Sequence, residues 1–166
     1  GIRALASAEE VAKQADVVIV AVKPWQVEAV LTPIKEILRE KALVSVAVNL
    51  LYDEYEMFLA PGSHHLSILP NTPVAVGEGI LICEEKHSLT ESQMEQVTAL
   101  LSSLGLVETV DAAHMGIAGT LSGCGPAFAA QFVEALADAA VLHGLSRQAA
   151  YRLASQMMAG TGKLQL

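Results

Sequence analysis

The chain has 166 residues, of which 52% are hydrophobic and 17% charged, and this composition excludes an intrinsically disordered protein. Eighteen acidic residues against ten lysines and arginines give a formal net charge of −8, and no basic cluster alternates with aromatic residues, so we expect no nucleic-acid partner. The apolar runs, such as 17–22, are far shorter than the roughly 20 residues of a membrane span, so we expect no membrane partner. The mean hydropathy of +0.44 then indicates surface buried inside the fold or between subunits.

Helices and strands alternate from the start of the chain. A capping box, Ser-Ala-Glu-Glu, predicts a short helix over 8–15. The β-branched run 17–22 is typical of a parallel strand that is covered on both faces. Pro24 begins a helical pattern that reaches about residue 40, with a second start at Thr32-Pro33. The apolar segment 42–48 predicts the next strand.

The same alternation continues to residue 110. The pattern predicts a helix over 51–59, a strand over 64–69, a turn over 70–73, a strand over 79–83, a helix over 90–104 and a strand over 106–110. This order is typical of an α/β layer with a mainly parallel sheet.

The character of the sequence changes after Asp111. Alanine is abundant, no β-branched run recurs, and the segment carries only five charged residues: Glu134, Asp138, Arg147, Arg152 and Lys163. Helices that are apolar nearly all round are normally buried, and a segment of this length cannot bury itself. We therefore predict two domains, 1–111 and 112–166, with the helices of the second packed against another chain.

The stretch Ser122-Gly123-Cys124-Gly125-Pro126 interrupts this helical segment. Its spacing fits neither a P-loop nor the glycine turn of a dinucleotide site. Pro126 suits the first turn of a helix and the glycines permit a bend. The pattern predicts a corner between two helices at this point, and leaves open whether that corner faces a ligand.

Two loops after predicted strands are candidate ligand contacts. Ala21-Val22-Lys23-Pro24 follows the strand 17–22, at the edge where open α/β sheets bind ligands, although Lys23 could equally be a solvated residue. Pro70-Asn71-Thr72-Pro73 is a stiff polar turn that could hold a ligand or only reverse the chain.

Other reactive side chains point to no site. Cys83 and Cys124 form no CxxC motif, and no secretory signal is present, so we expect reduced thiols in an intracellular compartment. A nucleophilic Cys124 would need a basic neighbour that the sequence does not supply. His64 and His65 are adjacent, so their rings would point to opposite faces of a strand, and we predict no metal site. We name no catalytic residue.

Four motifs together resemble pyrroline-5-carboxylate reductase, in order and spacing along nearly the whole chain. They are Ala21-Val22-Lys23-Pro24, Leu69-Pro70-Asn71-Thr72-Pro73-Val74, Leu121-Ser122-Gly123-Cys124-Gly125-Pro126-Ala127-Phe128, and residues 138–146 with Tyr151-Arg152-Leu153-Ala154. The resemblance implies a Rossmann domain, here partial, followed by an all-helical dimerisation domain whose helices interleave in a homodimer or larger assembly. It also implies that NADPH or NADH reduces 1-pyrroline-5-carboxylate to L-proline in the cytoplasm.

The resemblance assigns site residues position by position. The residues that match the family's cofactor-binding segments are Ala21, Val22, Lys23, Pro24, Ala47, Val48, Asn71, Thr72 and Pro73. The residues that match its substrate-binding segment are Ser122, Gly123 and Gly125. Cys124 replaces the serine that is usual in the family, and a thiol is a weaker hydrogen-bond donor than a hydroxyl. Val48 and Asn49 stand where the family usually has Ala-Gly, and they add bulk beside the cofactor.

The chain starts without methionine, and the family's glycine-rich turn and carboxylate-binding loop fall outside it. We therefore expect a fragment that is inactive by itself. Two alternatives remain open at this point: a non-catalytic dimerisation or binding module, and another Rossmann-type NADP-dependent reductase.

Overall fold

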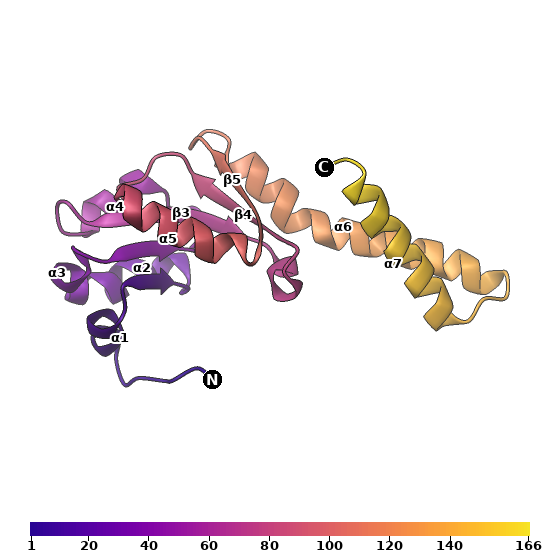
Figure 1. The fold of residues 1–166 in the computed structure, drawn as a ribbon, viewed down its shortest axis with the longest axis horizontal. Helices are drawn as coiled ribbons and strands as arrows, with labels where there is room; N and C mark the ends of the chain where they lie inside the picture. Colours follow the sequence, from indigo (N-terminus) through magenta and orange to yellow (C-terminus); the bar gives the residue numbers. More distant parts are fainter. The chain divides into compact units, whose positions relative to one another are not determined.

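The computed structural model describes all residues from Gly1 to Leu166. The chain forms two compact units, Gly1–Gly123 and Cys124–Leu166. The first contains a sheet with helices on both faces, and the second is helical (Figure 1). The division falls inside one long helix, and the predicted domains 1–111 and 112–166 stay a prediction.

A five-stranded sheet forms the centre of the first unit. Its strands are β1 (Val17–Val20), β2 (Ala42–Ser45), β3 (His64–Pro70), β4 (Gly79–Glu84) and β5 (Gly105–Val110), and they lie in the sheet in chain order. β1, β2 and β3 are parallel, and β5 is parallel to β4. The predicted α/β class with a mainly parallel sheet is therefore confirmed.

One strand pair departs from the parallel pattern, since β4 runs antiparallel to β3. Only a 3₁₀-helix, η2 (Thr72–Val76), and short turns connect these two strands. A parallel crossover needs a dozen or more residues, usually with a helix. The short connection therefore forces the chain to reverse direction.

Helices cover both faces of this sheet. They are α1 (Ala8–Gln14), α2 (Pro24–Leu31), η1 (Thr32–Ile34), α3 (Lys35–Leu38), α4 (Tyr52–Phe58) and α5 (Glu91–Ser102). One core joins α1 to α4 with β1 and β2, and contains Val20, Leu43 and Tyr55. The other joins α5 with β2, β3 and β4, and contains Val44 and Val97. Neighbouring residues of β2 enter different cores because side chains alternate across a strand.

The long helix α6 (Met115–Leu142) corrects one sequence prediction. The corner expected at residues 122–126 is wrong, because the helix runs through this stretch with Pro126 in its interior. Upstream of the glycines, Met115 and Ser122 are buried, and Ala118 and Gly119 are half-buried. The spacing i, i+3, i+4, i+7 is that of one helix face, and this face belongs to the first unit.

The second unit is a helical hairpin. α7 (Arg147–Lys163) turns back and crosses the last part of α6 (Figure 1). Ala137, Ala150 and Ala154 are buried in this unit, and Gly144 has a φ of 97° in the connecting loop.

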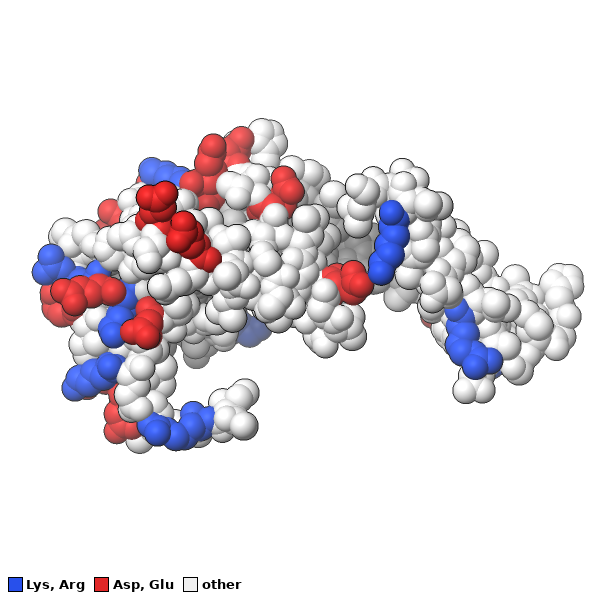
Figure 2. Space-filling model, viewed as in Figure 1, with Lys and Arg blue, Asp and Glu red and all other residues white.

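The helical segment exposes much apolar surface. The large exposed side chains include Leu121, Phe128, Phe132, Leu136, Leu153 and Met157. In the face drawn in Figure 2, acidic and basic residues gather over the sheet unit, whereas the helices are mostly uncharged. By length and composition alone, α6 could also cross a membrane, a test that helices of soluble proteins pass as well.

Candidate functional site

A hollow of ≈ 400 Å³ lies where β1 and β2 end. Its lining residues are Ala21, Val22, Lys23, Pro24, Gln26, Val46, Ala47 and Val48. β1 and β2 are paired in parallel, with Val20 opposite Ser45, so their carboxyl ends meet at one edge of the sheet. Ligands of open α/β sheets bind outside this edge. The structure thus brings together six of the predicted residues: Ala21, Val22, Lys23, Pro24, Ala47 and Val48.

The backbone on the β2 side of the hollow is held by hydrogen bonds. Val46 N–H donates to the carbonyl oxygen of Val20 at 3.0 Å, and Ala47 N–H donates to Ser45 Oγ at 3.1 Å. Ser45 Oγ also bonds to the Tyr55 hydroxyl. The buried Ser45 therefore fixes the chain direction just as β2 ends.

The other wall is the start of α2. Pro24 occupies the first turn, and Lys23 N–H donates to Gln26 Oε1 at 3.3 Å. This contact turns Gln26 back toward the helix start, where it lines the hollow. The Lys23 ammonium group and the N-terminus of α2 both carry positive charge, so this rim favours an anionic group.

Asn49, two residues after Ala47, has a φ of 63°, in the left-handed region. After glycine, asparagine is among the residues that adopt this conformation most readily. Glycine, which the family resemblance places at this position, adopts this conformation without strain. Val48 is 53% exposed, so its side chain takes up room at the mouth of the hollow.

Asn71, Thr72 and Pro73 follow β3 at the same edge of the sheet, but they do not line the hollow. Thr72 is exposed and Asn71 is buried. Asn71 N–H donates to the Ile80 carbonyl oxygen at 3.2 Å, and Asn71 Oδ1 accepts a bond from Ile80 N–H at 2.8 Å. The loop is thereby fixed to β4.

The predicted substrate residues lie on α6. Ser122 is buried, and its carbonyl oxygen accepts a hydrogen bond of 3.1 Å from Asn71 Nδ2. Gly123 is exposed, and Gly125 is half-buried beyond the division between the units. No heavy atom lies within 4 Å of a Cβ built on either glycine. The structure thus connects one predicted substrate residue with one predicted cofactor residue.

Sequence reasoning missed three features of this region. Gln26 and Val46 line the hollow, and the signal for Gln26 was its place three residues after the helix cap. Gly119 approaches β3 so closely that a Cβ there would lie 2.8 Å from Leu69 Cδ1. Its position three residues before the buried Ser122 could have indicated this contact.

The remaining candidate residues lie apart from the hollow. Burial raises the pKa of the Cys83 thiol to about 11, so this thiol is not reactive, and Cys124 is exposed. His64 Nδ1 pairs with the Ser88 carbonyl oxygen, and His65 Nε2 lies 2.8 Å from Glu56 Oε1. No group of three or more His, Cys, Asp and Glu side chains could hold a metal ion.

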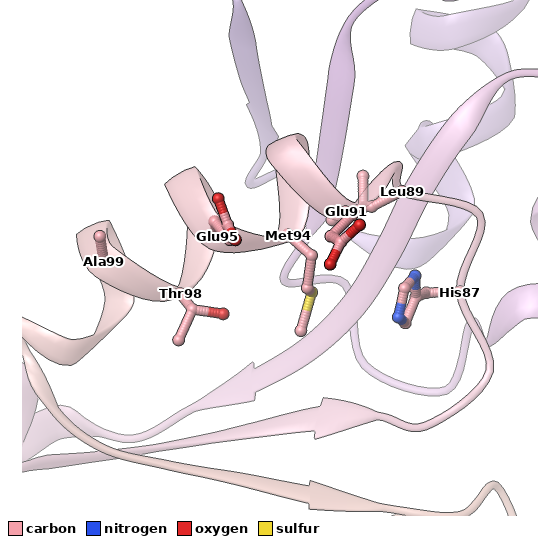
Figure 3. Close-up of a pocket in the computed structure, with 7 residues that line it drawn as sticks. All are labelled: His87, Leu89, Glu91, Met94, Glu95, Thr98 and Ala99. Atoms are coloured by element: carbon pink, nitrogen blue, oxygen red, sulfur yellow. The ribbon is translucent and has the colours of Figure 1, made fainter.

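A larger hollow, of ≈ 640 Å³, lies along α5. Figure 3 shows its lining residues on one face of α5 and on the loop before it: His87, Leu89, Glu91, Met94, Glu95, Thr98 and Ala99. None of the residues predicted from the sequence lines it. Its place along a helix, rather than at the strand ends, does not match a nucleotide site of this fold.

Two family models match separate parts of the chain. Residues 1–49 match a family described as NADP oxidoreductase, coenzyme F420-dependent, and residues 112–166 match the family described as pyrroline-5-carboxylate reductase dimerisation. The fold and these matches define the class: a Rossmann-type α/β unit followed by a helical dimerisation segment.

Individual relatives agree with this class. The chain is 43% identical over 168 residues to a pyrroline-5-carboxylate reductase of Treponema pallidum, covering 99% of this chain and 64% of the relative. It is 32% identical to the enzyme of that name from Methanosarcina acetivorans, covering 62% of its length. The chain is thus similar over nearly its whole length to pyrroline-5-carboxylate reductases, and it spans about three fifths of the length of these relatives.

Solved structures show the same fold. A Plasmodium falciparum pyrroline carboxylate reductase, crystallised with NADP bound, superposes with a TM-score of 0.87 at 33% identity, covering 96% of this chain and 61% of the other. A pyrroline-5-carboxylate reductase from Coxiella burnetii gives a TM-score of 0.84 at 31% identity, covering 94% of this chain and 59% of the other.

Proposed function

We propose that this chain belongs to an enzyme that reduces 1-pyrroline-5-carboxylate to L-proline with NADPH or NADH, in the cytoplasm. The observation that carries the proposal is the hollow at the ends of β1 and β2. It gathers six residues that the family resemblance assigns to the cofactor, and it does so in a chain 43% identical to an enzyme of this name.

The hollow fits part of a nicotinamide cofactor. Its walls are mostly short apolar side chains, which suit a flat ring, while Lys23 and Gln26 offer polar groups at its rim. When bound, the reduced cofactor supplies a hydride. Ala21, Val22, Pro24, Ala47 and Val48 would hold it by contact, and Lys23 would face its anionic part. Asn71, Thr72 and Pro73 would border its nicotinamide end.

Ser122, Gly123 and Gly125 would form the substrate side, in line with the family's substrate-binding segment. Ser122 is already held at the end of β3, beside the loop assigned to the nicotinamide. A reductase of this kind must keep the hydride and the C=N carbon close together. A fixed connection between α6 and the sheet serves that requirement.

Residues 112–166 would pair with a second copy of the chain. Phe128, Phe132 and Leu136 are exposed on α6, and Leu153 and Met157 on α7. Exposed apolar patches of this size on a helical segment mark interaction surfaces, and the matching family is described as a dimerisation segment. A partner helix would cover the apolar surface of α6. The same apolar side chains, together with its length, let α6 pass the test for a membrane-spanning helix.

The test uses the protein produced from its complete gene. We expect the absorbance of NADPH or NADH to fall when 1-pyrroline-5-carboxylate is added, and the particle mass to be at least that of a dimer. Lys23→Glu should weaken cofactor binding about fivefold, in keeping with about 1 kcal/mol for an exposed charge. Lys35→Glu, on α3 and outside the hollow, is the matched control.

Three results would point elsewhere. A dimer that binds neither cofactor would support a non-catalytic module. Oxidation of NADPH with other imines, but not with 1-pyrroline-5-carboxylate, would support a different reductase. Equal effects of the two charge reversals would remove Lys23 from the cofactor site.

A further inference from the structure

The carbonyl group of Ser122 lacks its ordinary helical partner. In an α-helix this oxygen would accept a bond from the N–H of residue 126, but that residue is Pro126, which has no N–H. Ser122 is only 5% exposed, so water cannot easily replace the missing donor. A buried carbonyl oxygen normally has a donor, and here Asn71 Nδ2 supplies one at 3.1 Å.

The Asn71 carboxamide is fixed from its other side as well. Asn71 Oδ1 accepts from Ile80 N–H at 2.8 Å. The Ile80 amide can only donate and the Ser122 carbonyl can only accept, so rotating the carboxamide by half a turn would break both bonds. Asn71 is 8% exposed, which protects both bonds from water.

A second contact reinforces the first. One turn before Ser122, Gly119 lies against Leu69, leaving no room for a Cβ. α6 therefore meets the end of β3 at two successive turns, once through the glycine and once through the asparagine. The helix continues through Pro126, and the Asn71 side chain, directly after β3, donates to the carbonyl oxygen that the proline leaves without a helical donor.

We propose that Asn71 is a positioning residue: its carboxamide replaces the donor that Pro126 lacks and thereby holds Ser122 of α6 at the end of β3. The functional part rests on the proposed reductase activity, in which the loop 71–73 borders the nicotinamide and Ser122 the substrate. The bond then sets the spacing between these two sides of the site.

The first experiment measures the bond without using activity. Asn71→Asp keeps the size of the side chain and the acceptor for Ile80, but replaces the donor by an oxygen. We expect backbone amides in residues 118–123 to exchange hydrogen at least tenfold faster in this variant of the complete protein. Ser67→Ala is the control, because its buried Oγ on β3 has no partner, and its exchange should stay within twofold of wild type.

The second experiment separates positioning from helix stability. Pro126→Ala, added to Asn71→Asp, gives Ser122 a helical donor again. We expect amide exchange to return toward the wild-type rate. We also expect kcat for 1-pyrroline-5-carboxylate to stay at least tenfold low, with cofactor affinity within threefold, because α6 is still not bonded to the loop.

Two outcomes would overturn the proposal. Unchanged exchange in Asn71→Asp would show that the bond does not hold Ser122. Recovery of both exchange and kcat in the double variant would show that Asn71 only completes the helix. A wild-type protein without reductase activity would refute the proposed function instead, and the exchange measurement would still decide whether Asn71 holds α6.

Discussion

Replacing Gly105 by alanine should strongly destabilise the sheet unit. Gly105 begins β5 opposite Gly79, the first residue of β4, and has a φ of 149°. A Cβ there would lie 2.1 Å from the Gly79 carbonyl oxygen and 2.5 Å from its nitrogen. These are backbone atoms within a sheet, so relief requires the two strands to move apart by about 1.4 Å, from 2.1 Å to the usual contact distance of about 3.5 Å.

The magnitude follows from two costs. Overpacking a tight site costs about 1–3 kcal/mol, and a side chain at a strained positive φ costs about 1–3 kcal/mol. Because one displacement relieves part of both, we expect the free energy of unfolding to fall by about 2–4 kcal/mol. With a urea dependence of about 2 kcal/mol per molar, the midpoint of unfolding should fall by about 1–2 M.

The assay is urea unfolding of the complete protein, followed by far-ultraviolet circular dichroism at one fixed protein concentration. Gly116→Ala is the matched control, because nothing lies within 4 Å of a Cβ at this helical position. Alanine there should leave the midpoint unchanged or raise it, since glycine inside a helix costs about 0.5–1 kcal/mol. A Gly105→Ala midpoint equal to that of wild type would refute the close backbone approach.

Three further predictions concern the site and the charges of the sheet unit. Asn49→Gly should keep stability within about 0.5 kcal/mol while Asn49→Val lowers it by about 1–2 kcal/mol, because a β-branched residue is strained at a φ of 63°; equal melting of the two variants would contradict this. Burial lowers the pKa of His65 in spite of the Glu56 carboxylate. The unfolded chain therefore takes up the proton first, and the free energy of unfolding should fall as the pH drops below about 6.5. His65→Gln should flatten this part of the profile of urea midpoint against pH, and an unchanged slope would exclude His65 as its cause. Burial raises the pKa of Glu84, whose Oε2 accepts a 2.8 Å bond from Tyr52 N–H, so its charge destabilises the fold at neutral pH and less so as the pH approaches 4.5. Glu84→Gln keeps an acceptor and should raise stability at pH 7 by on the order of 1 kcal/mol, a gain that shrinks in acid; a loss of stability at pH 7 would show that the charge is needed.

Much of the sheet unit could be predicted because its signals are local. The β-branched run from Val17 and the apolar run from Ala42 mark buried parallel strands, and both strands end within a few residues of the predicted ends. The carboxyl ends of paired parallel strands meet by geometry. The family resemblance had assigned Lys23 and Ala47, which are distant in sequence, to one site, and the meeting of the strand ends brings them together.

The connection between Asn71 and Ser122 could not be predicted, because it joins residues 51 positions apart through one side chain. The same contact explains the error at Pro126. Glycine and proline normally end a helix, whereas α6 continues through Pro126, and the Asn71 side chain supplies a donor that the local pattern does not show. The antiparallel β4, in contrast, left a readable signal in the short connection after β3.

The strand order of the sheet has a consequence for synthesis in the cell. Within residues 17–110 each strand after β1 pairs with the strand that precedes it in the chain, so none of these five has to enter between two that are already paired. As the polypeptide leaves the ribosome, the layer can grow at one side, strand by strand, from β1 to β5. Loop closures then stay short at every step, which favours rapid folding. The apolar helices α6 and α7 emerge only when the surface that receives Ser122 is already built.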